Sequence, residues 1–288
     1  MNMMLTSYDN LHYVFACLAT HSRVVKKIIT HFDKIHDYFN LSLFDEGLLN
    51  QFFHQQGQKI LSASVLMEEK RWREVLLTIQ YVPKLIQEEN LKNHWENYLD
   101  TLKIVHTIPE TPLAESIQFL NYLLEQYKNN NLISQIIKYE LTRNRTATYK
   151  FLINENIKKY NVHSIQADFD LYRAELNPSL LKESFDYSAL DYLATFQQVT
   201  SINKSEKITS HLNENVIFLK SRISGLVRTI KLKFDGELWL TKMIKSSCLL
   251  SWIEEASNKM NINREICIHF INNLISNDVI SIVSKNKD

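Results

Sequence analysis

Glycine, proline and cysteine are all scarce in this chain of 288 residues, which contains four, four and three of them. The glycines, at positions 47, 57, 225 and 236, form neither of the patterns that cradle phosphates, G-x-G-x-x-G and G-x-x-x-x-G-K-[ST]. Because glycine and proline are the main breakers of helices, their scarcity predicts long helices.

Charge of one sign and long apolar runs are also missing. The formal net charge is +1, so any binding of nucleic acid would have to depend on a local basic patch. No apolar run approaches the roughly 20 residues of a membrane span, and the first residues do not resemble an export signal. The cysteines, Cys17, Cys248 and Cys267, are odd in number and widely spaced, which favours reduced thiols. We expect a cytoplasmic globular protein.

Helical periodicity dominates the first part of the chain, and we expect a helical domain over residues 1–160 and a smaller domain over 161–288. Asp45 is the expected cap of one helix and Pro83 the expected end of another, and Thr111 or Pro112 begins a third. The apolar positions include Trp72, Trp95 and Phe119, which one sequence does not assign to core or to interface.

The stretch 215–234 predicts two strands, because β-branched and aromatic residues alternate with polar ones. The first runs to Gly225 and the second from Leu226 to Phe234, with the turn at Ser224-Gly225. The stretch contains five basic residues and no acidic one: Lys220, Arg222, Arg228, Lys231 and Lys233. Such a ribbon at a sheet edge suits an extended peptide that adds as a strand. The alternative is that its lysines only protect the edge from aggregation.

Around this ribbon the pattern is less uniform. Residues 162–173 fit a strand or a short helix, and residues 180–195 are weakly helical. After the ribbon, Gly236 is expected to turn the chain, and two helices follow, the second capped by Asn263. A short strand over 278–283 closes the series. The order strand, strand, helix, helix, strand is that of a winged-helix-like unit, so the fold class is α+β, a mostly helical bundle followed by a small domain with a short antiparallel sheet.

Catalytic patterns are not found in the sequence. No two of the ten histidines have the i, i+4 spacing of a helical metal site, and H-E-x-x-H and H-x-H do not occur. Cys248 and Cys267 have no second cysteine at C-x-x-C spacing, and the serines have no nucleophile-elbow context. We therefore expect no self-sufficient active site and no metal ligands in this chain.

Two segments resemble one protein family. Pro109 to Leu124, followed by Ile136-Ile137-Lys138-Tyr139-Glu140-Leu-Thr-Arg-Asn144, is similar to a stretch of the partner subunits of multinuclear non-haem iron-dependent oxidative enzymes. These partners serve methanobactin-type and related ribosomal peptide pathways. The phrase Asn215-Val-Ile-Phe-Leu-Lys-Ser-Arg222 resembles the strand that opens their C-terminal peptide recognition element. The resemblance covers roughly residues 108–283, and its motifs are short.

The resemblance implies a non-catalytic subunit that binds the leader of a ribosomally made precursor and presents it to the iron enzyme. Iron would belong to that partner, and this chain would hold no cofactor and bind neither nucleic acid nor membrane. The leader would add to the second strand, and the expected binding residues are Arg228, Ile230, Lys231, Leu232, Lys233 and Phe234. The helix carrying Tyr139, Glu140, Arg143 and Asn144 would meet the iron enzyme or brace the two domains.

Two functions from other classes are the alternatives. In a winged-helix DNA-binding regulator, the last helix, which Asn263-Arg264-Glu265 opens, would enter a major groove. That helix carries few basic residues, whereas phosphate contacts favour a cluster of them. A stand-alone enzyme is the third possibility, and it has no recognisable site.

Overall fold

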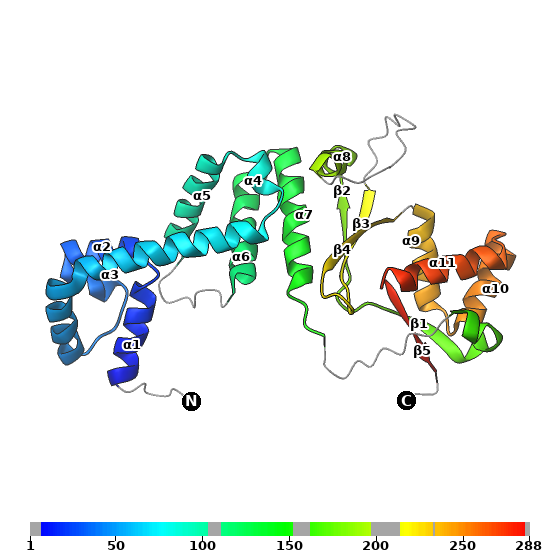
Figure 1. Cartoon of the computed structure of the whole chain (residues 1–288), viewed down its shortest axis with the longest axis horizontal. Coiled ribbons are helices and arrows are strands. Elements are labelled where there is room, and N and C mark those ends of the chain that lie inside the picture. The colour runs from blue at the N-terminus through cyan, green and yellow to red at the C-terminus, as the bar shows by residue number, and fades with distance from the viewer. Residues whose placement is uncertain (1–6, 103–110, 152–161, 197–213, 233, 286–288) are drawn as a thin grey trace. The chain divides into compact units, whose positions relative to one another are not determined.

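The computed structural model describes residues 7–102, 111–151, 162–196, 214–232 and 234–285 (Figure 1). The chain divides into two compact units, Met1–Tyr127 and Lys128–Asp288. The expected domain boundary at 160/161 lies in residues 152–161, outside the described residues. The division falls earlier because helix α7 (Asn131–Ala147) packs against the sheet of the second unit. The expected α+β class is confirmed.

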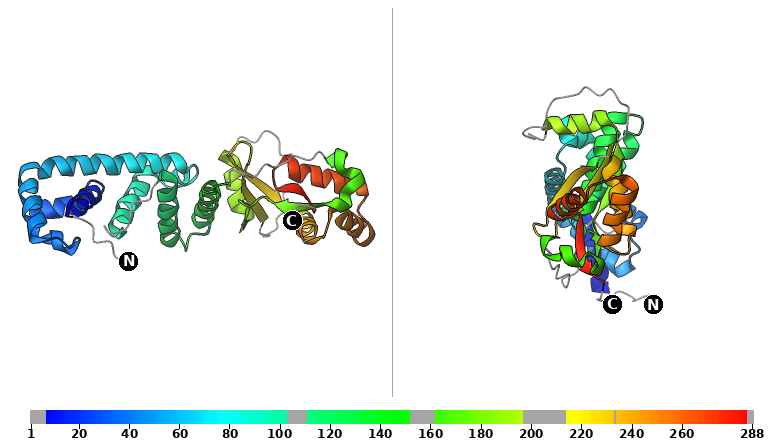
Figure 2. Two further views of the ribbon diagram at one scale, coloured as in Figure 1. Left: turned by 90° about the horizontal axis from the view of Figure 1, so that it is seen from below. Right: turned by 90° about the vertical axis from the view of Figure 1, so that its right-hand side faces the viewer.

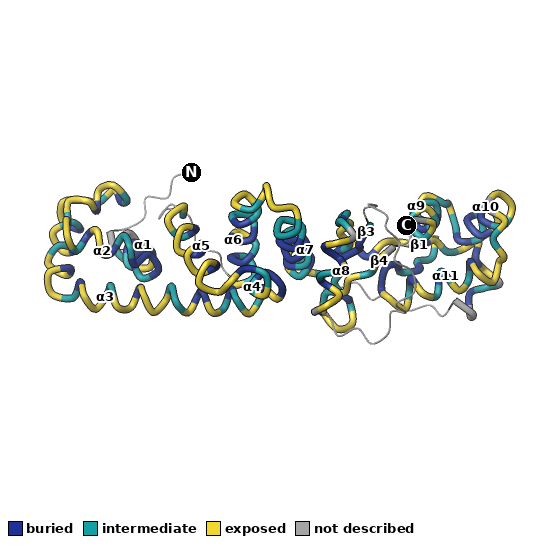
Figure 3. Tube along the Cα trace, turned by 90° about the horizontal axis from the view of Figure 1, so that it is seen from above, coloured by how far each residue is buried: buried dark blue, intermediate teal, exposed yellow. Residues whose placement is uncertain are grey.

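The described part of unit 1 is helical. Its elements are α1 (Ser7–Leu18), α2 (Ser22–Thr30), the 3-10 helix η1 (Phe32–Asp37), α3 (Leu43–Thr78), α4 (Val82–Leu85), α5 (Glu88–Thr101) and α6 (Pro112–Gln126). Apolar residues at helical spacing from α1, α2, η1 and α3 form one core, which includes Leu18, Val25, Ile28, Ile35 and Leu49. Much of the long helix α3 is exposed along its length (Figure 3).

The helix ends in unit 1 agree only in part with those predicted from the sequence. Thr111 caps α6 as expected, since its hydroxyl accepts a hydrogen bond from the backbone N–H of Ala114. Ser42 caps α3 instead of Asp45: its hydroxyl accepts from the Asp45 N–H at 3.1 Å and donates to the Asp45 carboxylate at 2.6 Å. Helix α3 ends at Thr78, before Pro83, which lies in the first turn of α4, where its missing N–H leaves no helical bond unmade.

Trp72, Trp95 and Phe119 belong to the interior of unit 1, with exposures of 3%, 2% and 0%. Their rings, from α3, α5 and α6, have centroids 5.4 to 6.1 Å apart, a spacing typical of favourable aromatic pairs. Beside them Arg71 and Glu115 form a buried ion pair, in which Arg71 Nε lies 3.1 Å from Glu115 Oε2. The aromatic residues are therefore core residues.

The described part of unit 2 contains two antiparallel sheets. The described elements after α7 are the 3-10 segment η2 (Val162–Leu171), β1 (Tyr172–Leu176), β2 (Leu181–Phe185), α8 (Tyr187–Phe196), β3 (Glu214–Lys220), β4 (Val227–Leu232), α9 (Phe234–Lys245), α10 (Leu249–Met260), α11 (Arg264–Ser276) and β5 (Ile280–Ser284). One sheet has the order β2-β3-β4 and the other pairs β1 with β5. The closing strand therefore pairs with β1 and not with the β3–β4 hairpin.

Three other segments differ from the expectation. Residues 162–173 are mostly a 3-10 segment, and only their last two residues enter β1. The segment expected to be weakly helical begins with β2, because Leu181 to Phe185 pair with β3, and only then becomes α8. Gly236 lies inside α9, where Asp235 and Glu237 in the first turn favour a helix start.

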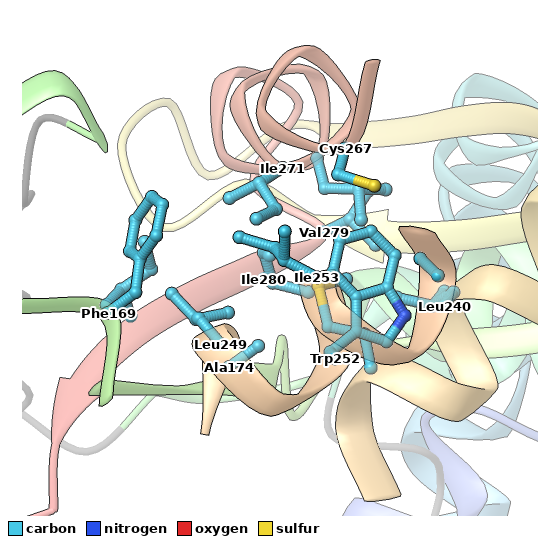
Figure 4. Close-up of a cluster of buried hydrophobic side chains, with 14 of the residues drawn as sticks. Phe169, Ala174, Leu240, Leu249, Trp252, Ile253, Cys267, Ile271, Val279 and Ile280 are labelled. Atoms are coloured by element: carbon cyan, nitrogen blue, oxygen red, sulfur yellow. The ribbon is translucent and has the colours of Figure 1, made fainter. Parts of the chain in front are cut away.

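The strand β3 is buried on both faces, because helices cover the sheet on both sides. Phe218 faces α7, where its ring lies 5.0 Å from that of Tyr139. Ile217 and Leu219 face the other way, into a core built with α9, α10 and α11. Figure 2 shows these helices beside the sheet, and Figure 4 shows the core around Trp252. A strand covered on both faces reads as a continuous apolar run, and Val216 to Leu219 are such a run.

A buried polar cluster at Asn177 joins the two sheets. The Asn177 side-chain amide donates to the carbonyls of Lys220 and Asp278, at 3.1 and 3.0 Å. Its oxygen accepts from the Ser179 N–H and hydroxyl, at 3.0 and 2.6 Å. The carbonyls of Lys220 and Asp278 and the N–H of Ser179 are thereby satisfied, which compensates for burial of the cluster.

Candidate functional site

The strand β4 lies at the edge of the three-stranded sheet, because the order among the described strands is β2-β3-β4. The hairpin that carries it closes with a hydrogen bond of 2.8 Å from the Ser221 N–H to the Leu226 carbonyl. Gly225 has φ +68°, as expected for the turn, since glycine has no Cβ to clash there. The predicted hairpin is confirmed, with its strands at 214–220 and 227–232.

The register determines which backbone groups of β4 point away from β3. The bond between Ser221 and Leu226 identifies a hydrogen-bonded pair, and such pairs alternate along an antiparallel ladder. Arg228, Ile230 and Leu232 therefore direct their N–H and C=O groups toward β3. Those of Val227, Thr229 and Lys231 point to the open side. An extended chain placed there would find three residues with outward donors and acceptors.

The side chains of β4 alternate between two faces. Thr229 and Lys231 lie opposite Phe218 and Val216, on the face toward α7. Arg228 and Ile230 lie opposite Leu219 and Ile217, on the face toward the core of unit 2, against which Ile230 packs. The side chains of Leu232 and Phe234, and all of Lys233, are outside the described residues.

The basic residues of the ribbon differ in how far they are engaged. The Lys220 ammonium donates to the carbonyls of Ala147 and Tyr149, at 2.9 and 2.8 Å, and so stabilises the end of α7. Lys231 Nζ lies 2.9 Å from a carboxylate oxygen of Glu214 on the adjacent strand. The backbone N–H of Arg222 donates to the Asp278 carboxylate at 2.6 Å, whereas its guanidinium reaches only the Leu176 carbonyl, at 3.5 Å, among the described residues.

Arg228, on β4 itself, differs from the two lysines and is engaged as weakly as the Arg222 guanidinium. Its guanidinium reaches only the Ser276 carbonyl, at 3.5 Å, among the contacts of the described residues, and its side chain is exposed. Of the four described cations of the expected ribbon, Lys220 and Lys231 therefore have close partners in the fold, and Arg222 and Arg228 each reach one carbonyl at 3.5 Å.

Tyr139 connects α7 to the edge strand within unit 2. Its ring lies 5.6 Å from Phe185 and 5.0 Å from Phe218, and its hydroxyl donates to Thr229 Oγ1 at 3.3 Å. Glu140 and Asn144 are buried on the same helix, with exposures of 0% and 3%, and Arg143 is half-buried. Both sides of this contact belong to unit 2, so Tyr139 braces two elements of one unit.

The tip of the hairpin is an apolar feature that the sequence analysis did not single out. Ile223 and Leu226 are 68% and 69% exposed, on either side of the turn. The available signal was two aliphatic residues flanking Ser224-Gly225, where turns usually carry polar residues. Glu214 was missed as well, and its role depends on the register that places it beside Lys231.

Metal ligands and thiols are the other side chains that could support chemistry. Among the described residues, no three His, Cys, Asp or Glu side chains are grouped so that they could hold a metal ion. Cys248 caps α10, and its sulfur accepts from the Ser251 N–H at 3.4 Å. Although burial alone would raise the pKa of this thiol, hydrogen bonds from Ser251 and Ser247 lower it overall.

No protein-family model matches the chain, and no curated protein matches it. Within the described ranges, no helix combines the length and the hydropathy that crossing a membrane requires.

Proposed function

We propose that the chain is a non-catalytic accessory subunit that binds the leader of a ribosomally synthesised precursor peptide by strand addition to β4. It presents that peptide to an iron-dependent oxidative partner enzyme, as the family resemblance implies. The iron belongs to the partner, and the chain acts in the cytoplasm. The observation that supports this proposal is the position of β4 at the sheet edge, with the outward backbone groups of Val227, Thr229 and Lys231.

A rigid platform lowers the cost of binding an extended peptide, because only the guest has to be ordered. The sheet has this property: β3 is buried on both faces, and Tyr139 ties β4 to α7. Tyr139, Glu140, Arg143 and Asn144 then act by holding the platform, and α7 remains the proposed face toward the iron enzyme.

The proposal is tested by removing one outward backbone donor. Thr229→Pro deletes an outward N–H and preserves the ladder bonds to β3, because proline is tolerated on an edge strand where its nitrogen faces outward. It also removes the hydroxyl that accepts from Tyr139, so Thr229→Val, which loses that hydroxyl and keeps the N–H, is the reference. A precursor peptide, which we expect to be encoded beside the gene, is labelled with a fluorophore and titrated with the full chain. We expect Thr229→Pro to bind about tenfold more weakly than Thr229→Val, since the hydrogen bond from the Thr229 N–H to the guest is lost.

Ser184→Pro is the matched control. Ser184 lies on β2, the opposite edge strand, and the same alternation directs its N–H outward. Its variant should bind the peptide as the unmodified chain does. Equal binding of the peptide by the unmodified chain, Thr229→Pro and Ser184→Pro would contradict strand addition at β4.

The composition of helix α11 gives little support to the DNA-binding regulator. The only basic residues of α11 are Arg264 and His269, and Ile266 beside them is a large exposed apolar residue. A helix in a major groove makes phosphate contacts through several cations. Retarded migration of duplex DNA at moderate salt, with no response to the peptide, would favour the regulator.

A further inference from the structure

The two faces of β4 differ in how far their side chains are already engaged. Toward α7, Thr229 accepts the hydrogen bond from Tyr139 and Lys231 pairs with Glu214 at 2.9 Å. On the opposite face, Arg228 has only the distant carbonyl of Ser276, and Ile230 is partly covered by the core. What remains for a guest is one cation and one aliphatic surface, two residues apart on the same face.

Backbone geometry brings a guest closest at these two residues. Arg228 and Ile230 direct their hydrogen-bonding groups toward β3, so an antiparallel guest residue opposite either one forms a non-hydrogen-bonded pair. Side chains approach most closely in such pairs, where Cα atoms are about 4.5 Å apart. Apolar pairs and pairs of opposite charge stabilise a sheet there, and like charges destabilise it.

We propose that the guest of β4 is an antiparallel strand with an apolar residue opposite Ile230 and, two residues later, Asp or Glu opposite Arg228. An antiparallel guest runs against β4 and meets Ile230 first, so its sequence reads apolar-x-acidic from the N-terminus. Antiparallel pairing is also slightly more stable per residue than parallel pairing. This inference rests on the proposed function, and it adds the chemistry of the peptide.

The intervening guest residue faces α7 and lies opposite Thr229. It forms a hydrogen-bonded pair, in which side chains are farther apart, and the Thr229 hydroxyl is already bonded to Tyr139. This position therefore selects little, and the pattern is set by the residues on either side of it.

The test begins with a display library of short random peptides selected on the immobilised full chain. Clones that bind Ser184→Pro but not Thr229→Pro are the ones that need the β4 edge. We expect these clones to be enriched in apolar-x-acidic sequences. Edge-dependent clones without the pattern would overturn this inference and leave strand addition standing, whereas a selection without any edge-dependent clone would contradict both.

Charge reversal provides the second arm. Selected peptides are synthesised and titrated against Arg228→Glu, which we expect to weaken acidic peptides about threefold to tenfold and to favour apolar-x-basic ones. Arg264→Glu is the matched control, because Arg264 is also exposed but begins the 13-residue helix α11, about 18 Å from its Ser276 end. Equal losses in both variants, or no loss in Arg228→Glu, would overturn the assignment of the acidic residue to Arg228.

Discussion

The hydroxyl of Tyr139 donates a hydrogen bond to Thr229 Oγ1 at 3.3 Å, across 90 residues of sequence. It connects a helix whose buried face covers the sheet to the strand at the sheet edge. Tyr139 is 4% exposed and its ring packs against Phe185 and Phe218. Tyr139 therefore holds the sheet from the α7 side in two ways, with its ring on β2 and β3 and with its hydroxyl on the edge strand β4.

Two substitutions separate these contributions. Tyr139→Phe removes the hydroxyl and should lower the free energy of unfolding by about 1 kcal/mol, the usual value of one hydrogen bond. Tyr139→Ala also removes the ring and should cost about 3–5 kcal/mol. Urea denaturation followed by circular dichroism measures both changes. Equal losses would show that the ring contributes nothing to the packing of α7 on the sheet.

The polar cluster at Asn177 predicts a further loss of stability in unit 2. Asn177→Ala leaves the carbonyls of Lys220 and Asp278 and the Ser179 hydroxyl with fewer partners. Buried groups that lose their partners cost about 1–3 kcal/mol each. We expect a lower urea midpoint than in Pro178→Ala, its exposed neighbour, which serves as the control. Identical midpoints would contradict the role assigned to Asn177.

The buried ion pair of unit 1 gives a test with its own optical signal. Glu115→Gln leaves the Arg71 guanidinium without its carboxylate, a change that typically costs about 3–5 kcal/mol. The guanidinium lies 5.9 Å from the centre of the Trp95 ring, so fluorescence reports the loss. Replacing both partners, as Arg71→Met with Glu115→Leu, should restore much of the stability, because no buried charge remains. A double variant less stable than Glu115→Gln would contradict this explanation.

Cysteine reactivity provides a pH-dependent prediction. Burial raises the pKa of the Cys17 and Cys267 thiols, whereas hydrogen bonds from Ser251 and Ser247 outweigh burial and lower that of Cys248. A lowered pKa means that the thiolate, the nucleophilic form, is present at lower pH. We expect iodoacetamide to label Cys248 first at pH 7.5, by mass spectrometry of the native chain. Ser251→Ala should slow that labelling, and faster labelling of Cys17 would contradict the assignment.

Local patterns in the sequence were sufficient for the hairpin and for several helix ends. The alternation in 226–232 and the glycine at 225 specify the β3–β4 hairpin, and Thr111 and Asn263 are caps because a side-chain oxygen is needed where a helix begins. The alternation also continues into Phe234, but the helix starts there because acidic residues follow in the first turn.

Pairings between distant segments were not predictable in the same way. Nothing in the polar sequence of β2 marks it as a strand until β3 lies beside it, and β5 finds its partner β1 more than one hundred residues earlier. The partners of the lysines were unpredictable for the same reason, because Lys220 reaches the end of α7 and Lys231 reaches Glu214 only in the folded unit. Residue type indicated a basic ribbon, and the register left Arg228 as the open cation of β4.

The most direct test of strand addition is amide-resolved hydrogen exchange of the full chain with and without the precursor peptide. The account predicts new protection at Val227, Thr229 and Lys231, whose N–H groups point outward, and little change at Arg228 and Ile230, which already bond to β3. Binding of the peptide with no new protection at Val227, Thr229 and Lys231 would contradict the account.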